Sequence, residues 1–206
     1  MKRQHGASLL LTLLMMICVM LIGVSASQLA LEGEQAARAG RDRQTAFQAA
    51  EDALNDAERD VAAGAPGAGA PGSGDGGADG PAARRAMFGA SAEWGDGCSP
   101  PGQGMAERAA EGAAPVWERV DLTGAEDGGR CSLEFGAMTG AGMPTGEGFL
   151  PFQRPRYIIE RMQCHQPGED ARAGASPSYC YRVTVIGFGS KPETQAVLQS
   201  VYRRKD

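Results

Sequence analysis

Four cysteines are the side chains of this 206-residue chain whose type and spacing are most able to do chemistry. Cys98, Cys131, Cys164 and Cys180 are separated by 33, 33 and 16 residues, which matches none of the compact ligand spacings of zinc sites. An even number of cysteines in an exported segment is typical of a disulfide framework. We therefore expect Cys164–Cys180 to join two late strands and Cys98–Cys131 to tie the glycine-rich middle of the chain. Cys18 lies in an apolar run and is expected to stay unpaired.

Histidine chemistry would have to use a single residue, because His5 lies at the extreme N-terminus and His165 is the other histidine of the chain. His165 sits beside Cys164 in front of the polar sequence QPGED. A nucleophile–histidine pair or triad would need a base held in a fixed position. We interpret His165 as a surface loop histidine.

A glycine motif in the middle of the chain matches the dinucleotide fingerprint by letter, through Gly67, Gly69 and Gly72. That fingerprint needs a preceding strand and a following helix, whereas here the motif follows a predicted helix and lies in repetitive sequence. We interpret the match as chance.

Two carboxylates of the same glycine-rich stretch, Asp75 and Asp79, fall short of the six or more oxygen ligands that calcium takes. The sequence therefore predicts a protein that is not an enzyme and that needs no metal and no cofactor. The net charge of −5 argues against general nucleic-acid binding. We interpret the terminal cluster Arg203–Lys205 as a solvated basic tail.

The long uncharged run near the N-terminus determines where the rest of the chain is located. Residues Ala7–Leu31 carry no charge, and about 20 such residues suffice for a helix to cross a bilayer. Lys2 and Arg3 precede the run, so the positive-inside rule places the N-terminus in the cytoplasm and the rest of the chain outside.

Two fates are open for this run: removal as a signal peptide or retention as an anchor. The small residues at Val24–Ser27 could serve as a signal-peptidase site, but the run is longer than a usual signal peptide core. The helical pattern also continues past it, because Phe47, Ala50, Leu54, Ala57 and Val61 recur at spacings of three and four. One helix from about residue 7 to 63 would be about 85 Å long. Its second half would be amphipathic, and we expect these apolar residues to pack in the core of this chain.

The beginning of the chain resembles the leader of type IV pilins: a short basic segment that ends in Gly6, a small residue, an uncharged run and an amphipathic continuation. The segment GVSASQLALEGEQAARAGRDRQTAFQAAEDALNDAE is similar to the N-terminal segment of the PilX minor pilins. Its Gly23–Ser25 junction, Arg41–Arg43 step and Phe47–Leu54 run carry the likeness, which is close from Gly6 to about Glu58.

The resemblance implies that a prepilin peptidase cuts between Gly6 and Ala7 and that the apolar helix is kept. It implies a minor pilin in a complex that primes assembly at the tip of a type IV pilus, with roles in twitching and adhesion. Its partners would be other minor pilins and the major pilin through the N-terminal helix, with a large tip adhesin as a further candidate. The location would be the inner membrane of a Gram-negative bacterium and then the pilus tip.

The alternatives are a type II secretion pseudopilin and an exported periplasmic protein with an ordinary signal peptide. The sequence also departs from the pilin pattern: Ala7 stands where mature pilins usually begin with Phe, Leu11 where they carry Glu, and Gln28 where they often have Pro. Leu11 matters most, because it removes the charge at that position.

The expected fold class is α+β and pilin-like, with the long helix packed on a small antiparallel sheet. Strands are expected at Pro155–Cys164, Tyr179–Gly189 and Thr194–Arg204, which are rich in Tyr, Val and Ile, with shorter candidates at Pro115–Leu122 and Cys131–Gly136. The turn GSKPE predicts that the last two form a hairpin. With only 6% aromatic residues and 30 glycines, we expect a thin core.

We expect five regions along the chain: a leader at 1–6, a transmembrane or filament-core helix at 7–31, its amphipathic continuation at 32–63, a Gly/Pro-rich loop region at 64–114 and a sheet domain at 115–206.

Overall fold

The computed structural model describes residues 7–63, 84, 86–88, 93–95, 98, 102–164 and 178–203. The chain divides into two compact units, Met1–Arg41 and Asp42–Asp206. The described residues of the first unit are all helical, and the second unit contains the rest of that helix and the sheet. Each is described by itself below.

Helix α1 runs from Ala7 to Ala63, as the sequence predicts. Within the first unit three hydroxyl groups turn back onto the helix: Ser25 donates to the carbonyl of Leu21 at 2.9 Å, and Thr12 and Ser27 bond in the same way. These bonds satisfy the polar atoms without water, which leaves the helix surface compatible with an apolar environment.

The second unit is built on a five-stranded sheet with the strand order β1-β3-β4-β5, and β2 pairs with β3 off this path. The three long strands are β3 (Arg156–Cys164), β4 (Ser178–Phe188) and β5 (Gln195–Arg203). They pair antiparallel, with Tyr157 opposite Val185 and Ile186 opposite Val197. This confirms the predicted antiparallel hairpin of the last two strands and the α+β class.

The shorter elements differ from the sequence-based expectation. The candidate strand Pro115–Leu122 is wrong, because Val116–Arg119 forms the short helix α3. A tertiary contact accompanies this turn: the buried carboxylate of Glu160 accepts the Val116 N–H at 3.3 Å. β2 covers only Leu133–Glu134 of the second candidate strand. β1 (Met105–Glu107) lies in the region expected to be loop, and it pairs parallel to β3.

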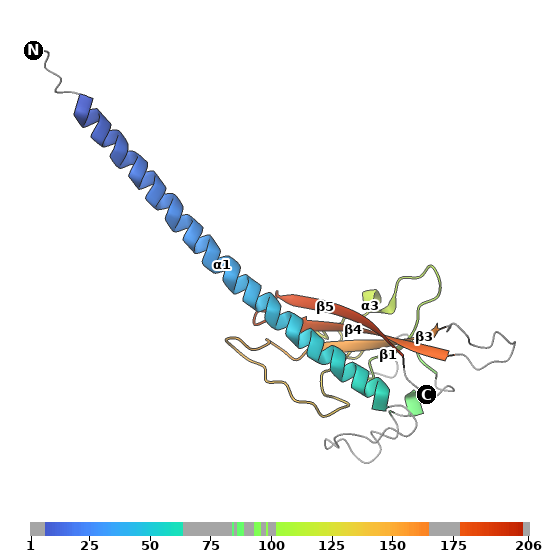
Figure 1. Cartoon of the computed structure of the whole chain (residues 1–206). Helices are drawn as coiled ribbons and strands as arrows, with labels where there is room; N and C mark the ends of the chain where they lie inside the picture. Colours follow the sequence, from blue (N-terminus) through green and yellow to red (C-terminus); the bar gives the residue numbers. More distant parts are fainter. Residues whose placement is uncertain are drawn as a thin grey trace, which may run out of the picture. The chain divides into compact units, whose positions relative to one another are not determined.

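The main core lies between α1 and one face of the sheet, as Figure 1 shows for the part of α1 that crosses β3, β4 and β5. The helix contributes mostly small side chains, and the sheet contributes the large ones. The buried members are Ala50, Ala53, Ala57 and Val61 from α1, Met105, Leu133, Tyr157, Ile159, Tyr181, Val183 and Val185 from the sheet, and Phe88 and Phe135 from other segments. The predicted stripe was wrong at Phe47, which is 41% exposed.

A second, smaller core covers the opposite face of the sheet. Ile158 and Ile186 face away from α1 and pack with Val116 of α3 and with Leu122. The sheet is therefore buried on both faces over β3 and β4. This agrees with the near-continuous burial of the β4 side chains.

Gly187 of β4 is the point of closest approach between helix and sheet. A Cβ atom built on Gly187 would lie 2.3 Å from the carbonyl oxygen of Ala46 and 2.5 Å from the amide nitrogen of Ala50. Both are backbone atoms of α1, so no side-chain rotation relieves the clash. A glycine here lets the two backbones approach closely.

We expect Gly187→Ala to lower the free energy of unfolding by about 1–3 kcal/mol, the usual cost of overpacking a rigid contact. Chemical denaturation of the full chain in detergent, followed by near-ultraviolet circular dichroism, measures this. The matched control is Gly142→Ala, because an added Cβ there meets no atom within 4 Å. Equal stability of the two variants would contradict the close helix–sheet contact.

Candidate functional site

The predicted processing site lies at the start of α1. Gly6 is outside the described residues, and the helix begins at Ala7. Leu11, at the position where the resemblance leads us to expect a charged residue, is 64% exposed on the helix surface. The structure thus places Leu11 where its side chain faces whatever surrounds the helix.

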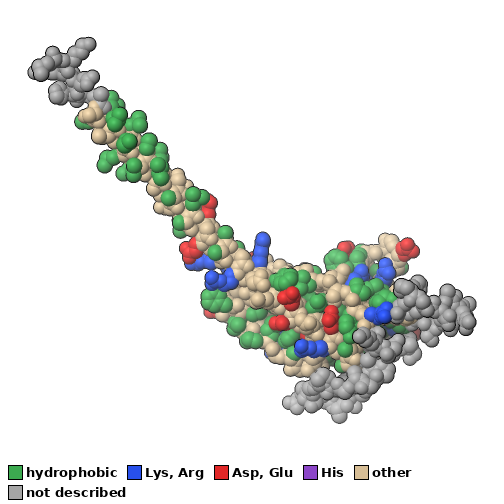
Figure 2. Space-filling model, in the orientation of Figure 1, with side chains coloured by type: hydrophobic (Ala, Val, Ile, Leu, Met, Phe, Trp, Pro, Cys, Tyr) green, Lys and Arg blue, Asp and Glu red, His purple; other side chains and the backbone are tan. Residues whose placement is uncertain are grey.

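The apolar surface of α1 extends from Ser8 to Leu31, and every residue of that stretch is exposed. Figure 2 shows apolar side chains along the visible face of this part, with charged side chains appearing only further along the helix. Among the described residues, α1 is the one helix that is long and apolar enough to cross a membrane, judged by length and composition. Such a surface requires lipid or other apolar helices around it.

Three buried aspartates on the second half of α1 attach the loops of the second unit to the helix. The first is Asp42, which binds the turn between β4 and β5. The backbone N–H and the hydroxyl of Ser190 donate to its Oδ1 at 2.5 and 2.6 Å. Burial raises the pKa of Asp42, but hydrogen bonds from Ser190, Thr194 and Lys191 outweigh it, so the pKa of Asp42 is lowered overall.

The second aspartate, Asp56, holds the loop that follows β2. The Gly136 N–H donates to its Oδ2 at 2.8 Å, and the Thr139 hydroxyl donates to its Oδ1. Gly136 has a φ of +77°, a left-handed conformation that glycine adopts at no steric cost. The turn can therefore aim its N–H at the carboxylate.

The third aspartate, Asp60, forms a buried ion pair with Arg84. The Nε of Arg84 donates to both carboxylate oxygens, at 3.0 and 3.1 Å, and Nη2 also donates to Oδ2. The hydroxyl of Tyr157 lies 3.5 Å from the same oxygen. Burial and the charge of Asp60 raise the pKa of Tyr157 well above its usual value, so the phenol stays protonated.

Sequence reasoning missed these three aspartates. The available signal was their position on the helix: Asp56 and Asp60 immediately precede Ala57 and Val61, which belong to the predicted apolar stripe. A carboxylate at the border of a buried stripe needs a partner. The sequence does not predict which residues these partners are. For Asp42 and Asp56 they lie in loops 80 or more residues further along the chain.

Both cysteine pairs are bonded in the structure, Cys98 to Cys131 and Cys164 to Cys180. The second bridge joins the end of β3 to the beginning of β4, and the first ties residue 98 to the segment before β2. Cys18 is a free, exposed thiol in the apolar part of α1. One bridge thus cross-links two neighbouring strands of the sheet, and the other fixes residue 98 to the segment before β2.

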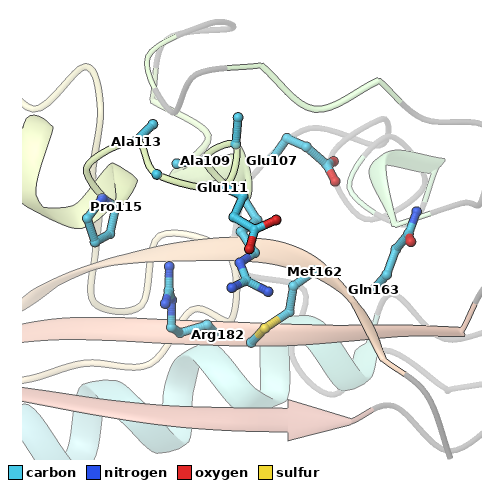
Figure 3. A pocket seen from close by; sticks show the side chains of 11 residues that line it. Glu107, Ala109, Glu111, Ala113, Pro115, Met162, Gln163 and Arg182 are labelled. Carbon is cyan, nitrogen blue, oxygen red and sulfur yellow. The ribbon is translucent and has the colours of Figure 1, made fainter.

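A polar pocket of about 570 Å³ opens on the sheet face opposite α1. Figure 3 shows Arg182 and Met162 on the sheet side of this pocket and Glu111 on the loop side, with α1 beyond the sheet. Arg182 is bound to the buried Glu160 by two hydrogen bonds of 2.8 and 2.7 Å. Its charge is thus already compensated, and the pocket wall presents no unpaired buried charge at this point.

No group of three or more potential metal ligands occurs among the described residues. Other candidates fall outside them: His5, His165, the glycine motif from Gly67 to Gly72, the Asp75–Asp79 pair and the tail from Arg204 onward. Arg203 itself is exposed at the end of β5.

A long N-terminal helix, apolar and exposed in its first part and packed on an antiparallel sheet in its second, defines a pilin-like protein. Two family models match this chain. PilX N-terminal matches residues 5–55, and type IV pilus assembly protein PilX C-term matches residues 75–204. The chain therefore belongs to the PilX family of type IV pilus assembly proteins.

Searches of curated proteins and of solved structures give no match to this chain.

The attachment of Asp42 to the β4–β5 turn predicts a pH-dependent stability. Because the pKa of Asp42 is lowered by folding, its stabilising contribution is present above the unfolded pKa of about 4 and is lost as the pH falls through the folded value. We expect Asp42→Asn to lower the free energy of unfolding at pH 7 by about 1–3 kcal/mol. The difference from wild type should shrink below about pH 4.

Denaturant titrations at pH 7 and pH 3, with the disulfides intact, measure this difference. Asp52→Asn is the control, because Asp52 lies on the exposed side of the same helix. A stability difference between Asp42→Asn and wild type that is the same at both pH values would contradict the proposed attachment.

Proposed function

We propose that this chain is a minor pilin that belongs to a small complex at the tip of a type IV pilus and helps to start its assembly. Membership of the PilX family supports the pilus system. The observation that carries the finer proposal is Leu11, exposed on the apolar part of α1 where pilins carry glutamate.

The argument from Leu11 is electrostatic. An ionised carboxylate inside a bilayer is expensive, so the glutamate of other pilins needs a compensating role. Its proposed role is to attract the N-terminal ammonium of the adjacent subunit already in the filament. This chain has no carboxylate before Glu32. A subunit that docks beneath an earlier one would lack that attraction, whereas a subunit with nothing above it would lose nothing.

The apolar part of α1 would serve twice. Before assembly it would hold the protein in the inner membrane with its N-terminus in the cytoplasm. After assembly it would pack against the N-terminal helices of the major pilin and of other minor pilins. Both surroundings are apolar, so the same exposed surface suits each of them.

The first prediction concerns processing by a prepilin peptidase. We expect the mature chain to begin at Ala7, and Gly6→Leu to leave the leader uncut and the protein in the inner membrane, because the bulky side chain would not fit the cleavage site. N-terminal sequencing by mass spectrometry measures this. Gly23→Ala is the control, since Gly23 lies in open surroundings within α1.

Normal maturation of the Gly6→Leu variant would contradict processing at this site. A mature N-terminus at Ser27 would instead indicate an ordinary signal peptide. Minor pilins and type II secretion pseudopilins share the leader, so the processing test does not separate these two classes. Their genomic neighbours do.

The second prediction concerns position in the filament. We expect immunogold labelling of this protein at pilus ends only, and a sharp loss of surface pili when its gene is deleted. Removing the retraction motor should restore some pili, because the defect lies in initiation. Leu11→Glu should give no gain in assembly, since a subunit at the tip has no ammonium above it to attract.

Even labelling along the shaft, at a density like that of the major pilin, would contradict the tip position. A clear increase in piliation with Leu11→Glu would contradict the electrostatic argument independently of the labelling result.

A further inference from the structure

Strand β5 forms one edge of the sheet and is nine residues long. Figure 1 shows it along the border of the sheet, with β4 on its inner side. Among the described residues, no hydrogen bond reaches its backbone from the outer side. The opposite edge is different, because β1 has only three residues, two of them buried. Short edge strands are one way in which proteins avoid unwanted pairing, and β5 lacks that protection.

The register identifies the backbone groups that point outward from β5. The Gly189 N–H donates to the Thr194 carbonyl at 2.7 Å, so this opposed pair is hydrogen-bonded. Hydrogen-bonded and non-hydrogen-bonded pairs alternate along an antiparallel ladder. The residues whose N–H and C=O point away from β4 are therefore Gln195, Val197, Gln199, Val201 and Arg203.

Two of these residues also carry exposed apolar side chains. Val197 is 53% exposed and Val201 is 62% exposed, on the sheet face away from α1. Gln199 lies between them and donates to the Thr184 hydroxyl at 2.8 Å, which holds its side chain back against β4. The edge thus offers unpaired backbone groups together with two valines at the spacing of a strand.

We infer that the outer edge of β5 binds an extended segment of another protein, which adds a strand to the sheet. The segment would carry apolar, β-branched side chains at alternate positions, matching Val197 and Val201. Main-chain hydrogen bonds provide the affinity in this mode of recognition, and the alternate side chains provide its specificity. The inference concerns a surface that the proposed function does not use.

The charges at and beside the two ends of β5 indicate which end of the partner segment is acidic. Arg203 is exposed at one end of the edge, and Arg204 and Lys205 follow it in the sequence. At the other end, Lys191 and Glu193 are both exposed and of opposite sign. The end of the bound segment that lies beside Arg203 therefore carries carboxylates.

A second copy of this chain does not fit as the occupant. Two β5 strands related by a two-fold axis would run antiparallel. α1 runs in the same direction as β5, because Asp42 binds Ser190 and Glu58 binds Ser200. Self-pairing would therefore set the two Asp42–Ala63 parts of α1 antiparallel, whereas the sheet units of subunits in one filament all point in the same direction. This exclusion rests on the proposed function.

The test uses the full chain in detergent and a fluorescent peptide of two acidic residues followed by alternating valine and threonine. We expect this peptide to bind at least tenfold more tightly than the same peptide with a central proline, or with lysines in place of the acidic residues. On binding, amide hydrogen exchange should slow at Val197, Gln199 and Val201. Fluorescence anisotropy and hydrogen-exchange mass spectrometry measure these effects.

The variant Gln199→Pro removes an outward N–H and the side-chain bond to Thr184, but no backbone hydrogen bond to β4. It should therefore keep the fold and lose at least tenfold in peptide affinity. Gln199→Thr also loses the side-chain bond to Thr184 but keeps the N–H, so it is the matched control and should bind like wild type. Val197→Lys/Val201→Lys tests the apolar contact without altering the backbone, should the proline variant fail to fold.

Equal binding of the proline-containing peptide, or undiminished binding by the lysine variant, would overturn the proposal. A disulfide-linked dimer of Gln199→Cys, formed at native protein concentration in a Cys18→Ser background, would overturn it in favour of self-pairing.

Discussion

The contact between the alanine-rich face of α1 and the sheet is the constraint on which the second unit depends. Alanine side chains and Gly187 let the two backbones approach to near van der Waals distance. Small residues on the helix leave the burial of large apolar area to Tyr157, Tyr181 and the valines of β4. In the described part of the chain, loss of this contact would leave the sheet with only the smaller core on its opposite face and the two disulfides.

Buried polar attachments supplement this apolar contact at places where loops meet the helix. Asp42, Asp56 and Asp60 each accept hydrogen bonds from a different loop or segment. A buried carboxylate without partners would be costly, whereas one with two or three donors fixes a loop in one position. The three aspartates therefore determine how the irregular segments, rich in glycine, are held against the regular part of the unit.

The two parts of α1 follow different physical rules within one continuous helix. From Ser8 to Leu31 the helix surface is uncharged and exposed on all sides. Because no described part of this chain covers it, this part of the helix is stable only when lipid or neighbouring helices surround it. From Asp42 onward the helix is amphipathic and is stabilised by its own sheet. The two edges of the sheet differ: β1 is too short to pair with a further strand, whereas the long strand β5 leaves its outer backbone groups available for pairing.

The sequence by itself determined the helix from residue 7 to 63, the late strands and the β4–β5 hairpin, because hydrophobic periodicity and turn residues act locally. It also carried the family, through the segment from Gly6 to about Glu58. Only the tertiary structure decided that Val116–Arg119 is helical, that Phe47 is exposed and that β1 joins β3 in parallel. It likewise decided the partners of the buried aspartates. These features depend on contacts between residues far apart in the chain, such as Glu160 with Val116 and Asp42 with Ser190. A local sequence pattern cannot predict such contacts, because it depends only on neighbouring residues.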